Sequence, residues 1–300
     1  MKTLQGCVAV VAGASRGAGR GIALALGDAG ATVYVAGRTM RGGAKPLDGA
    51  AGTIDDTADE VSARGGVGIP VRTDFTSESE VAALFDRVKN EHDHLDVLAN
   101  AVWGAADGNK ASNDWQTAWG KPFWEQPASA WQHMMNGGPY AYFLASYHAL
   151  RLMAPRKRGL IVGVTDGIMD GVSEEVLAGG TTGEYQGQLV WTLAHEVINR
   201  LLYGVSAEAK AHKVAVVTLM PGFMRTERVQ QYLNTEKLRK MMRYDLAEST
   251  EYIGRAVASL AGDRKVLQKT GRIHFVADLA REYGFTDVDG KVVPRFNPHG

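Results

Sequence analysis

Three glycines in the segment Gly13-Ala-Ser-Arg-Gly17-Ala-Gly19 have a spacing suited to binding a phosphate. Glycine lets the backbone turn tightly and lets a diphosphate approach it closely. An apolar run at residues 7–12 precedes the segment, and residues 20–29 carry apolar side chains at helical spacing. A helix that begins here offers free N–H groups and a partial positive charge to an anion. We therefore predict a dinucleotide site rather than a glycine-rich turn without a ligand. The loop residues assigned to it are Gly13, Ser15, Arg16, Gly17 and Gly19.

Two arginines near this loop indicate which dinucleotide would bind. Arg16 lies in the loop, and Arg38 follows the second apolar run, residues 31–36, where no acid is present. An acid there would bond the ribose 2′-hydroxyl of NAD, whereas a cation accommodates a 2′-phosphate, to which a guanidinium forms paired hydrogen bonds. We predict NADP(H); the alternative for Arg38 is a solvated cation in a loop.

Strands and helices that alternate along the chain must position these groups. Such alternation is typical of a parallel sheet that is covered by helices on both faces. The predicted fold class is therefore α/β, a Rossmann-type doubly wound parallel sheet of about seven strands. The predicted strands are residues 7–12, 31–36, 67–72, 95–99, 160–165, 214–219 and 272–276.

Residues 1–300 are expected to form a single domain, since no linker-like segment divides them. Long loops are predicted at 101–127, 166–187 and 223–247, the last as a partly helical lid, with an irregular tail at 281–300. The first loop is rich in aromatic side chains, which would line an apolar substrate pocket or seal a subunit contact. These aromatic residues are Trp103, Trp115, Trp119, Phe123 and Trp124.

The composition excludes several classes of function. The 33 Lys and Arg residues balance the 33 Asp and Glu residues, so nothing indicates a nucleic-acid partner. A single cysteine, Cys7, fits a reducing compartment, and no stretch resembles a signal peptide or a membrane span. No histidine spacing suggests a metal site. We expect a cytoplasmic protein with a small-molecule substrate.

The order of elements and motifs resembles the short-chain dehydrogenase/reductase family over nearly the whole chain. The glycine spacing matches, Leu98-Ala99-Asn100-Ala101 stands at a further family motif, and segment 278–290 resembles one branch of the family. The resemblance implies a homodimer or homotetramer, with long helices at about 127–153 and 188–211 in subunit contacts. It also implies that Arg16 and Arg38 form an NADP(H) pattern. The further cofactor-binding residues that it implies are Asp74, Asn100, Pro221, Gly222 and Thr226.

The four catalytic positions that this resemblance implies are all replaced. The family places a tyrosine on a helix as proton donor, a lysine four residues later, a serine after the fifth strand and an asparagine on the preceding helix. The tyrosine and lysine positions fall on Trp191 and His195, and the serine position falls on Asp166. The asparagine position falls on Gly138, with Asn136 two residues earlier.

A histidine beside a carboxylate could take over the proton transfer. An indole N–H is no useful acid at neutral pH, whereas a histidine has an unperturbed pKa near 6.5, which a nearby Asp166 would raise. We therefore predict His195 with Asp166 as an acid/base pair, and Tyr185 could instead swing a phenol into the site. The alternatives are that His195 packs or binds water, that Trp191 fills space and that Tyr185 is merely half-buried.

Three functions stay open at this point. The first is an NADP(H)-dependent oxidoreductase that acts on a carbonyl or alcohol, because the cofactor carries the hydride chemistry. The second is an enzyme that binds the cofactor but catalyses a non-redox cyclisation or dehydration. The third is a non-catalytic NADP(H)-binding protein that partners an active paralogue, since a fold does not fix a function.

Overall fold

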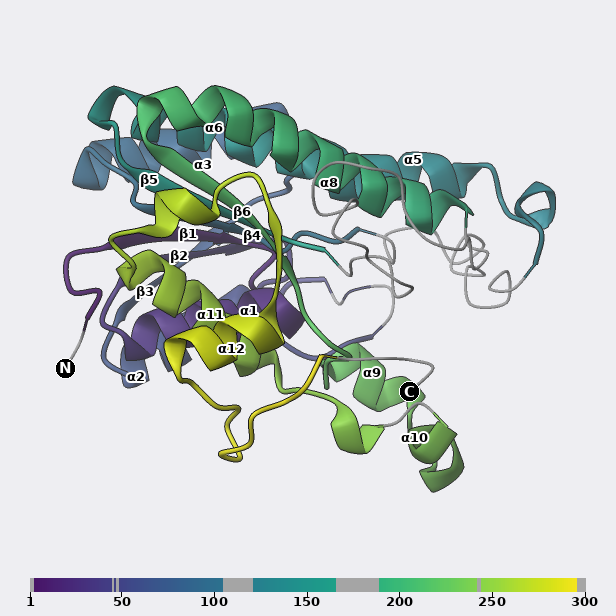
Figure 1. Ribbon diagram of the computed structural model, residues 1–300. Helices are drawn as coiled ribbons and strands as arrows, with labels where there is room; N and C mark the ends of the chain where they lie inside the picture. The colour runs from purple at the N-terminus through teal and green to yellow at the C-terminus, as the bar shows by residue number, and fades with distance from the viewer. Residues whose placement is uncertain are drawn as a thin grey trace.

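Seven parallel strands form one sheet in the part of the chain that the computed structural model describes, which is residues 3–44, 46, 49–104, 121–165, 189–241 and 244–295. The strand order is β3-β2-β1-β4-β5-β6-β7, which confirms the predicted doubly wound parallel sheet (Figure 1). The strands are β1 (Val8–Ala12), β2 (Thr32–Gly37), β3 (Val67–Arg72), β4 (Val97–Asn100), β5 (Gly159–Val164), β6 (Val214–Met220) and β7 (Ile273–Phe275).

The chain reverses its direction of travel across the sheet between β1 and β4. After β1 it builds β2 and β3 on one side, and it then returns to pair β4 with the other side of β1. Ala12 at the end of β1 lies opposite Ala36 on one neighbour and Asn100 on the other. This switch point is where open α/β sheets bind ligands, outside the carboxyl ends of their strands.

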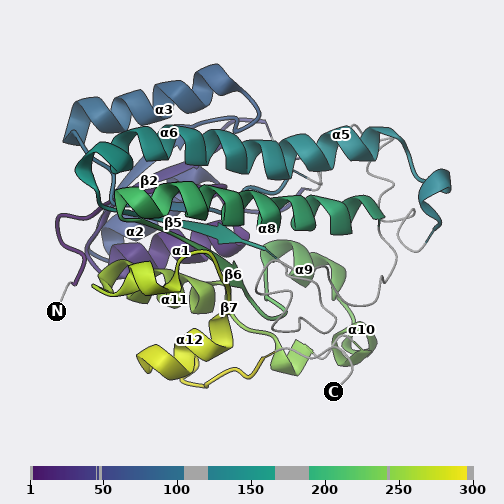
Figure 2. The same cartoon turned by 45° about the horizontal axis from the view of Figure 1, so that its top comes forward.

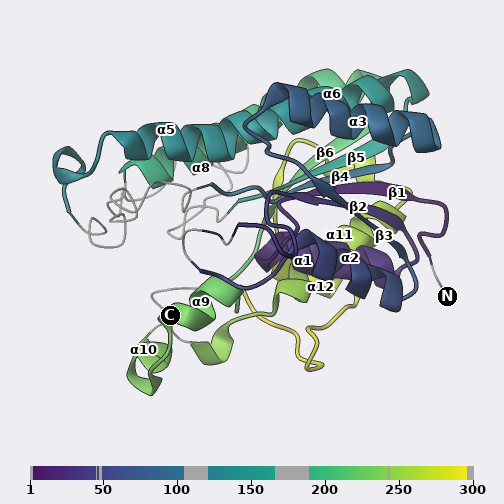
Figure 3. The same ribbon diagram turned by 180° about the vertical axis from the view of Figure 1, so that it is seen from behind.

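Helices cover both faces of the sheet (Figures 1 and 3). One face is covered by the helix that begins at the glycine loop and by its neighbours. The helices of this layer are α1 (Gly17–Asp28), α2 (Ile54–Ala63), α11 (Thr250–Gly262) and α12 (Val276–Tyr283). The opposite layer contains α3 (Glu78–His92), α5 (Ser129–Met135), α6 (Ala141–Arg156) and α8 (Leu189–Ala209). The central strands are mostly apolar, and β1 is apolar along its whole length, because both faces of the sheet are buried against these helices.

A close contact between α1 and α11 fixes the helix that begins at the glycine loop. A Cβ atom on Gly21 would lie 1.8 Å from the carbonyl oxygen of Thr250, and one on Gly254 would lie 2.3 Å from the carbonyl oxygen of Gly21. The two helix backbones therefore touch with no side chain between them, so α1 has little freedom to shift along the sheet.

Most boundaries follow from local chemistry. The side chains of Thr53 and Ser77 cap α2 and α3 by accepting from backbone N–H groups, as the sequence pattern predicts. The long helix expected at 127–153 is formed by α5 and α6 in line (Figure 2), and between them lies the π-helical turn Asn136–Tyr140, which contains Pro139. Val276 starts α12, so β7 ends one residue before the predicted strand does.

The predicted loops differ in how much of them the structure describes. Residues 105–120 and 166–188 lie outside the described part of the chain, so Trp115 and Trp119 do as well. Segment 223–247 contains α9 (Glu227–Tyr232) and α10 (Glu236–Met241), and α12 reaches into the segment expected to be an irregular tail. The short turns are η1 (Phe123–Glu125), η3 (Lys210–His212), η4 (Tyr244–Leu246) and η5 (Val266–Lys269).

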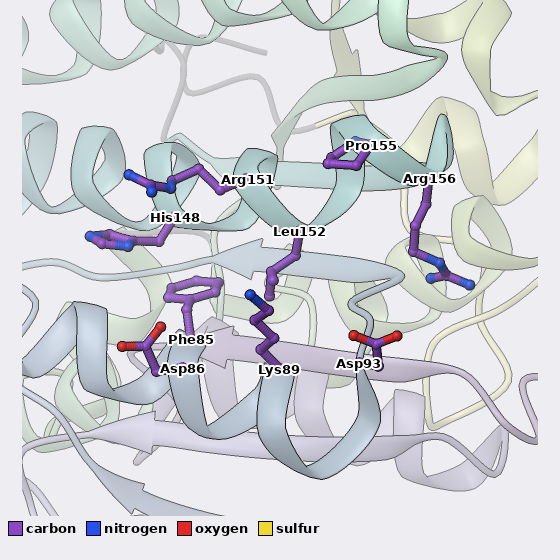
Figure 4. Close-up of a pocket in the computed structure, with 9 residues that line it drawn as sticks. All are labelled: Phe85, Asp86, Lys89, Asp93, His148, Arg151, Leu152, Pro155 and Arg156. Carbon is purple, nitrogen blue, oxygen red and sulfur yellow. The ribbon is translucent and has the colours of Figure 1, made fainter.

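A hollow of about 540 Å³ lies between α3 and α6, and its lining includes Lys89, Asp93 and Arg156 (Figure 4). These residues stand at or next to the carboxyl ends of the two helices, which precede β4 and β5. The hollow therefore extends along the two helices towards the amino edge of the sheet and shares no residue with the glycine loop. Among the described helices, none is long and apolar enough to cross a bilayer.

Candidate functional site

The glycine loop after β1 has no room for side chains at two of its glycines. Gly13 has a positive φ of 78°, and a Cβ atom there would lie 2.7 Å from the carbonyl oxygen of Ala101. A Cβ atom on Gly19 would lie 2.3 Å from the carbonyl oxygen of Gly13. The loop thus packs its backbone against the end of β4 and against the first turn of α1, with Ser15 buried between them. Such a backbone surface is what a diphosphate needs.

Asn100 ends β4 beside this loop and is fully buried. Neither its amide nitrogen nor its amide oxygen has a hydrogen-bond partner among the described residues. A buried amide without partners is costly and uncommon, so the residue fits a place where a polar ligand group comes close. Asn100 lies opposite Ala12, at the start of the glycine loop.

The two arginines flank the end of β2 but have different surroundings. Arg16 donates to the carbonyl oxygens of Ala51 and Gly52, at 2.9 Å each, and to Thr39 Oγ1 at 3.3 Å. Arg16 therefore ties the loop after β2 to the glycine loop. The side chain of Arg38 is 43% exposed, and its Nη1 atom lies 4.0 Å from a carboxylate oxygen of Asp74.

Asp74 follows β3 and closes the same corner of the site. Its Oδ1 atom accepts from the backbone N–H and the hydroxyl of Thr76, at 2.9 and 2.8 Å, which leaves Oδ2 on the side of Arg38. The structure thus brings the predicted residues Arg16, Arg38 and Asp74 to one corner, at the carboxyl ends of β2 and β3.

The turn after β6 carries α9 onto the glycine loop. Pro221 and Gly222 follow β6, and Thr226 caps α9 by accepting from the backbone N–H of Val229 at 3.1 Å. The next residue, Glu227, accepts a hydrogen bond from the backbone N–H of Gly17 at 2.7 Å. Sequence reasoning did not select Glu227, because no local pattern pairs a residue of this segment with the glycine loop.

A partly buried cluster of charged residues holds the turn after β6 in place. The guanidinium of Arg225 lies 3.2 Å from Asp287, which also accepts from the backbone N–H of Ser249 at 2.8 Å. The backbone of Arg225 donates to the carbonyl of Glu248, and the backbone of Glu248 donates to that of Phe223, at 2.8 Å each. Sequence reasoning missed these residues as well, since they are far apart in the chain.

Glu248 is the least compensated acid of this cluster. It is 1% exposed, and its carboxyl oxygens make no well-formed hydrogen bond within the described structure. Burial raises the pKa of Glu248 to about 8, and Asp287 adds to the rise, whereas the Gly222 amide and Arg225 oppose it.

An aromatic cluster contains the residues predicted at the family's catalytic positions. The ring of His195 is buried and stacks on Trp103, with centroids 4.3 Å apart and planes at 20°. Trp191 lies 5.1 Å from the ring of His195 and 4.7 Å from that of Trp103. The Nδ1 atom of His195 is 3.3 Å from Thr165 Oγ1, a hydrogen bond across the end of β5. The predicted partners Asp166 and Tyr185 lie outside the described residues.

Gly138 also belongs to this cluster, because Trp103 covers it. A Cβ atom on Gly138 would lie 3.1 Å from the indole ring of Trp103 and 3.6 Å from Ile198. The asparagine that the family places here would need Trp103 to move. Phe123 and Trp124 are exposed and contact each other at 5.4 Å. Among the described residues, no group of three or more His, Cys, Asp or Glu side chains could hold a metal ion.

Comparison with known proteins gives both a family and a fold. The family described as short chain dehydrogenase matches residues 7–237. The chain is 36% identical to mouse (Mus musculus) "Dehydrogenase/reductase SDR family member 1", over 97% of this chain and 86% of the relative. A short chain dehydrogenase from Mycobacterium thermoresistibile has a similar structure, with a TM-score of 0.73 and 20% identity, over 97% of this chain and 92% of that one.

Other solved structures with the same fold use different cofactors. One is YwfH, an NADPH-dependent reductase of bacilysin biosynthesis (TM-score 0.67, 20% identity, 90% of this chain and 96% of that one). Another is a 7α-hydroxysteroid dehydrogenase in complex with NADH (TM-score 0.67, 21% identity, 91% and 93%). At these identities the likeness shows the fold alone, so the choice between NAD and NADP depends on this chain's own residues.

The raised pKa of Glu248 predicts a pH-dependent stability. Between the ordinary value of 4.5 and about 8, the folded protein keeps a proton that the unfolded chain releases, so stability falls as the pH rises through this window. Replacing Glu248 with glutamine removes this loss. The free energy of unfolding of the variant relative to wild type should therefore increase from pH 5 to pH 8, by at most about 1.4 kcal/mol for each pH unit. Urea unfolding at both pH values measures it, and a constant difference would contradict the assignment.

Proposed function

We propose that this chain, which belongs to the short-chain dehydrogenase family, is an NADP(H)-dependent oxidoreductase that acts on a small carbonyl or alcohol substrate. The observation that carries the proposal is the carboxyl edge of β1, β2 and β4. At this edge the glycine loop has no room for side chains at Gly13 and Gly19. Beside it lie the buried amide of Asn100, which has no hydrogen-bond partner among the described residues, and the guanidinium groups of Arg16 and Arg38. A bound nicotinamide would supply the hydride chemistry of such an enzyme.

The chain's own residues would hold the cofactor along this edge. The glycine loop and the first turn of α1 would bind the diphosphate, and Arg38, with Arg16 behind it, would bind the 2′-phosphate. Asp74 would lie beside the adenine, and Asn100 would bond a polar group near the ribose. Pro221, Gly222 and Thr226 would complete the nicotinamide end, because they form the turn after β6.

His195 would hold and move the proton of the reaction. Its Nδ1 atom is bonded to Thr165, which fixes the ring, so the proton would be exchanged at Nε2. Trp191 cannot replace the family's tyrosine as an acid, and its contact with His195 supports a packing role. Asp166 directly follows Thr165 in the chain, and we propose it as the carboxylate partner of His195 in the proton transfer; Tyr185 is the alternative proton donor.

A second candidate is an NADP(H)-binding protein without catalysis of its own. One observation favours it, namely that Trp103 stacks on His195 and covers Gly138, so that an aromatic cluster fills the place of the family's catalytic residues. A non-redox reaction on the same scaffold would again depend on His195 and Asp166.

The outer faces of α6 and α8 would form a subunit contact in a homodimer or homotetramer. Tyr140, Phe143 and Tyr147 are 39–47% exposed and stack in a row along one side of α6, and Val197 and Tyr203 are exposed on α8. A row of exposed aromatic side chains is typical of an interface.

Sedimentation velocity should show a dimer or tetramer that Phe143→Asp weakens, and a wild-type monomer would refute the assembly.

Removal of the Arg38 guanidinium should weaken NADPH binding specifically. In Arg38→Ala we expect the Kd for NADPH to rise by about 10- to 100-fold, with little change for NADH, because only NADPH carries the 2′-phosphate. Fluorescence titration with both cofactors measures this. Arg87→Ala, which removes an arginine paired with Glu91 on α3, is the matched control. An equal loss for both cofactors would show that Arg38 does not select the phosphate.

Removal of the His195 imidazole should slow turnover without loss of the cofactor. Loss of a general acid typically costs about 10²- to 10⁴-fold, so the rate of NADPH oxidation with an aldehyde or ketone should fall by this amount in His195→Ala. The Kd for NADPH should stay the same, and Trp191→Phe should retain most of the rate. Full activity in His195→Ala would refute the acid role. Product without any NADPH absorbance change would favour non-redox chemistry, and NADPH binding without turnover would favour the second candidate.

A further inference from the structure

We propose that Glu227 is a built-in competitor for the diphosphate of the cofactor and that it thereby sets the nucleotide affinity of this protein. The inference rests on the proposed function, because it assumes that a dinucleotide binds at the glycine loop. It assigns to Glu227 a role that the glycine motif alone does not imply. The observations concern where the carboxylate lies, what holds it there and what it would oppose.

The carboxylate of Glu227 lies on the group that a diphosphate would use. Gly17 is the first residue of α1, so its N–H group has no partner within the helix. Glu227 accepts a hydrogen bond from this N–H at 2.7 Å, a distance typical of a charge-assisted bond. The helix dipole favours a negative charge at this position, whether the charge comes from a side chain or from a phosphate.

The contacts that hold α9 over the glycine loop involve residues other than Glu227, so the side chain of Glu227 can move away from the loop. Gln231, one turn further along α9, donates to the carbonyl of Gly49 at 3.4 Å, and Thr226 caps the helix from its own side chain. Ahead of the helix, Arg225 is fixed by Asp287 and by backbone pairing with Glu248. The carboxylate is thus presented to Gly17 from an anchored turn by a helix of six residues.

A carboxylate and a diphosphate cannot share this place. Both are anions, and both would accept from the N–H groups at the start of α1, so a dinucleotide binds only when the carboxylate of Glu227 withdraws. The work of breaking its bond to Gly17 is subtracted from the cofactor's binding free energy. Ligands that contact only Arg38 and Asp74 do not compete with the carboxylate of Glu227, so their affinity does not depend on it.

The test compares two ligands on wild type, Glu227→Gln and Glu227→Ala. NADPH carries the diphosphate, whereas adenosine 2′-monophosphate carries the adenine and the 2′-phosphate without it. We expect the affinity for NADPH to increase by about three- to tenfold in Glu227→Ala, and by less in Glu227→Gln, which keeps an acceptor but loses the charge. Affinity for adenosine 2′-monophosphate should not change. Glu236→Gln, on the exposed first turn of α10, is the matched control for lost charge.

The outcomes separate this inference from the proposed function. If the affinity for NADPH is unchanged or lower in both Glu227 variants, the competitor role is wrong. The proposed function still holds in that case, provided that the wild-type protein binds NADPH. A gain that appears equally with adenosine 2′-monophosphate, or equally in Glu236→Gln, also overturns it, because the effect would then be one of general charge. If no variant binds NADPH or NADH, the proposed function fails and the inference fails with it. Calorimetry or fluorescence titration gives each Kd without any need for turnover.

Discussion

The close approach of backbone to backbone at the glycine loop is the constraint on which the site depends. Gly13 touches the end of β4, and Gly19 touches Gly13, so strand, loop and helix meet without intervening side chains. The same kind of contact recurs between Gly21 and Gly254, where α1 meets α11. Because these backbone contacts allow little movement, the start of α1 has a fixed position beyond the carboxyl end of β1. Asn100, Arg38 and the turn after β6 are then arranged around that place.

Sequence alone predicts the parts of the fold that depend on local chemistry. The apolar run of β1, the caps Thr53 and Ser77 and the glycine spacing are all short-range patterns, and the structure has the elements that they indicate. The alternation of strands and helices then predicts a parallel sheet with helices on both faces, as observed. The interruption of the long helix at Asn136–Tyr140 was missed, since the choice of a π turn around Pro139 depends on tertiary packing.

The parts of the site that could not be predicted depend on contacts between distant residues. Glu227 and Gly17 are 210 positions apart, and Asp287 reaches Ser249 across 38. The residues predicted at the family's catalytic positions show the same limit. Counting along the chain finds Gly138, Trp191 and His195, but it does not reveal that Trp103 lies against all three. These three residues therefore belong to one packing arrangement around the ring of Trp103.

The cluster around Asp287 ties the order of synthesis to the completion of the site. The glycine loop, Arg225 and Ser249 all leave the ribosome before Asp287 does, yet the carboxylate of Asp287 bonds both Arg225 and the start of α11. A nascent chain that has emerged only as far as residue 286 thus carries every residue of the nucleotide edge but lacks the group that secures the turn above it. Asp287, which follows the last strand of the sheet in the chain, therefore secures a turn whose neighbour, the glycine loop, is synthesised much earlier.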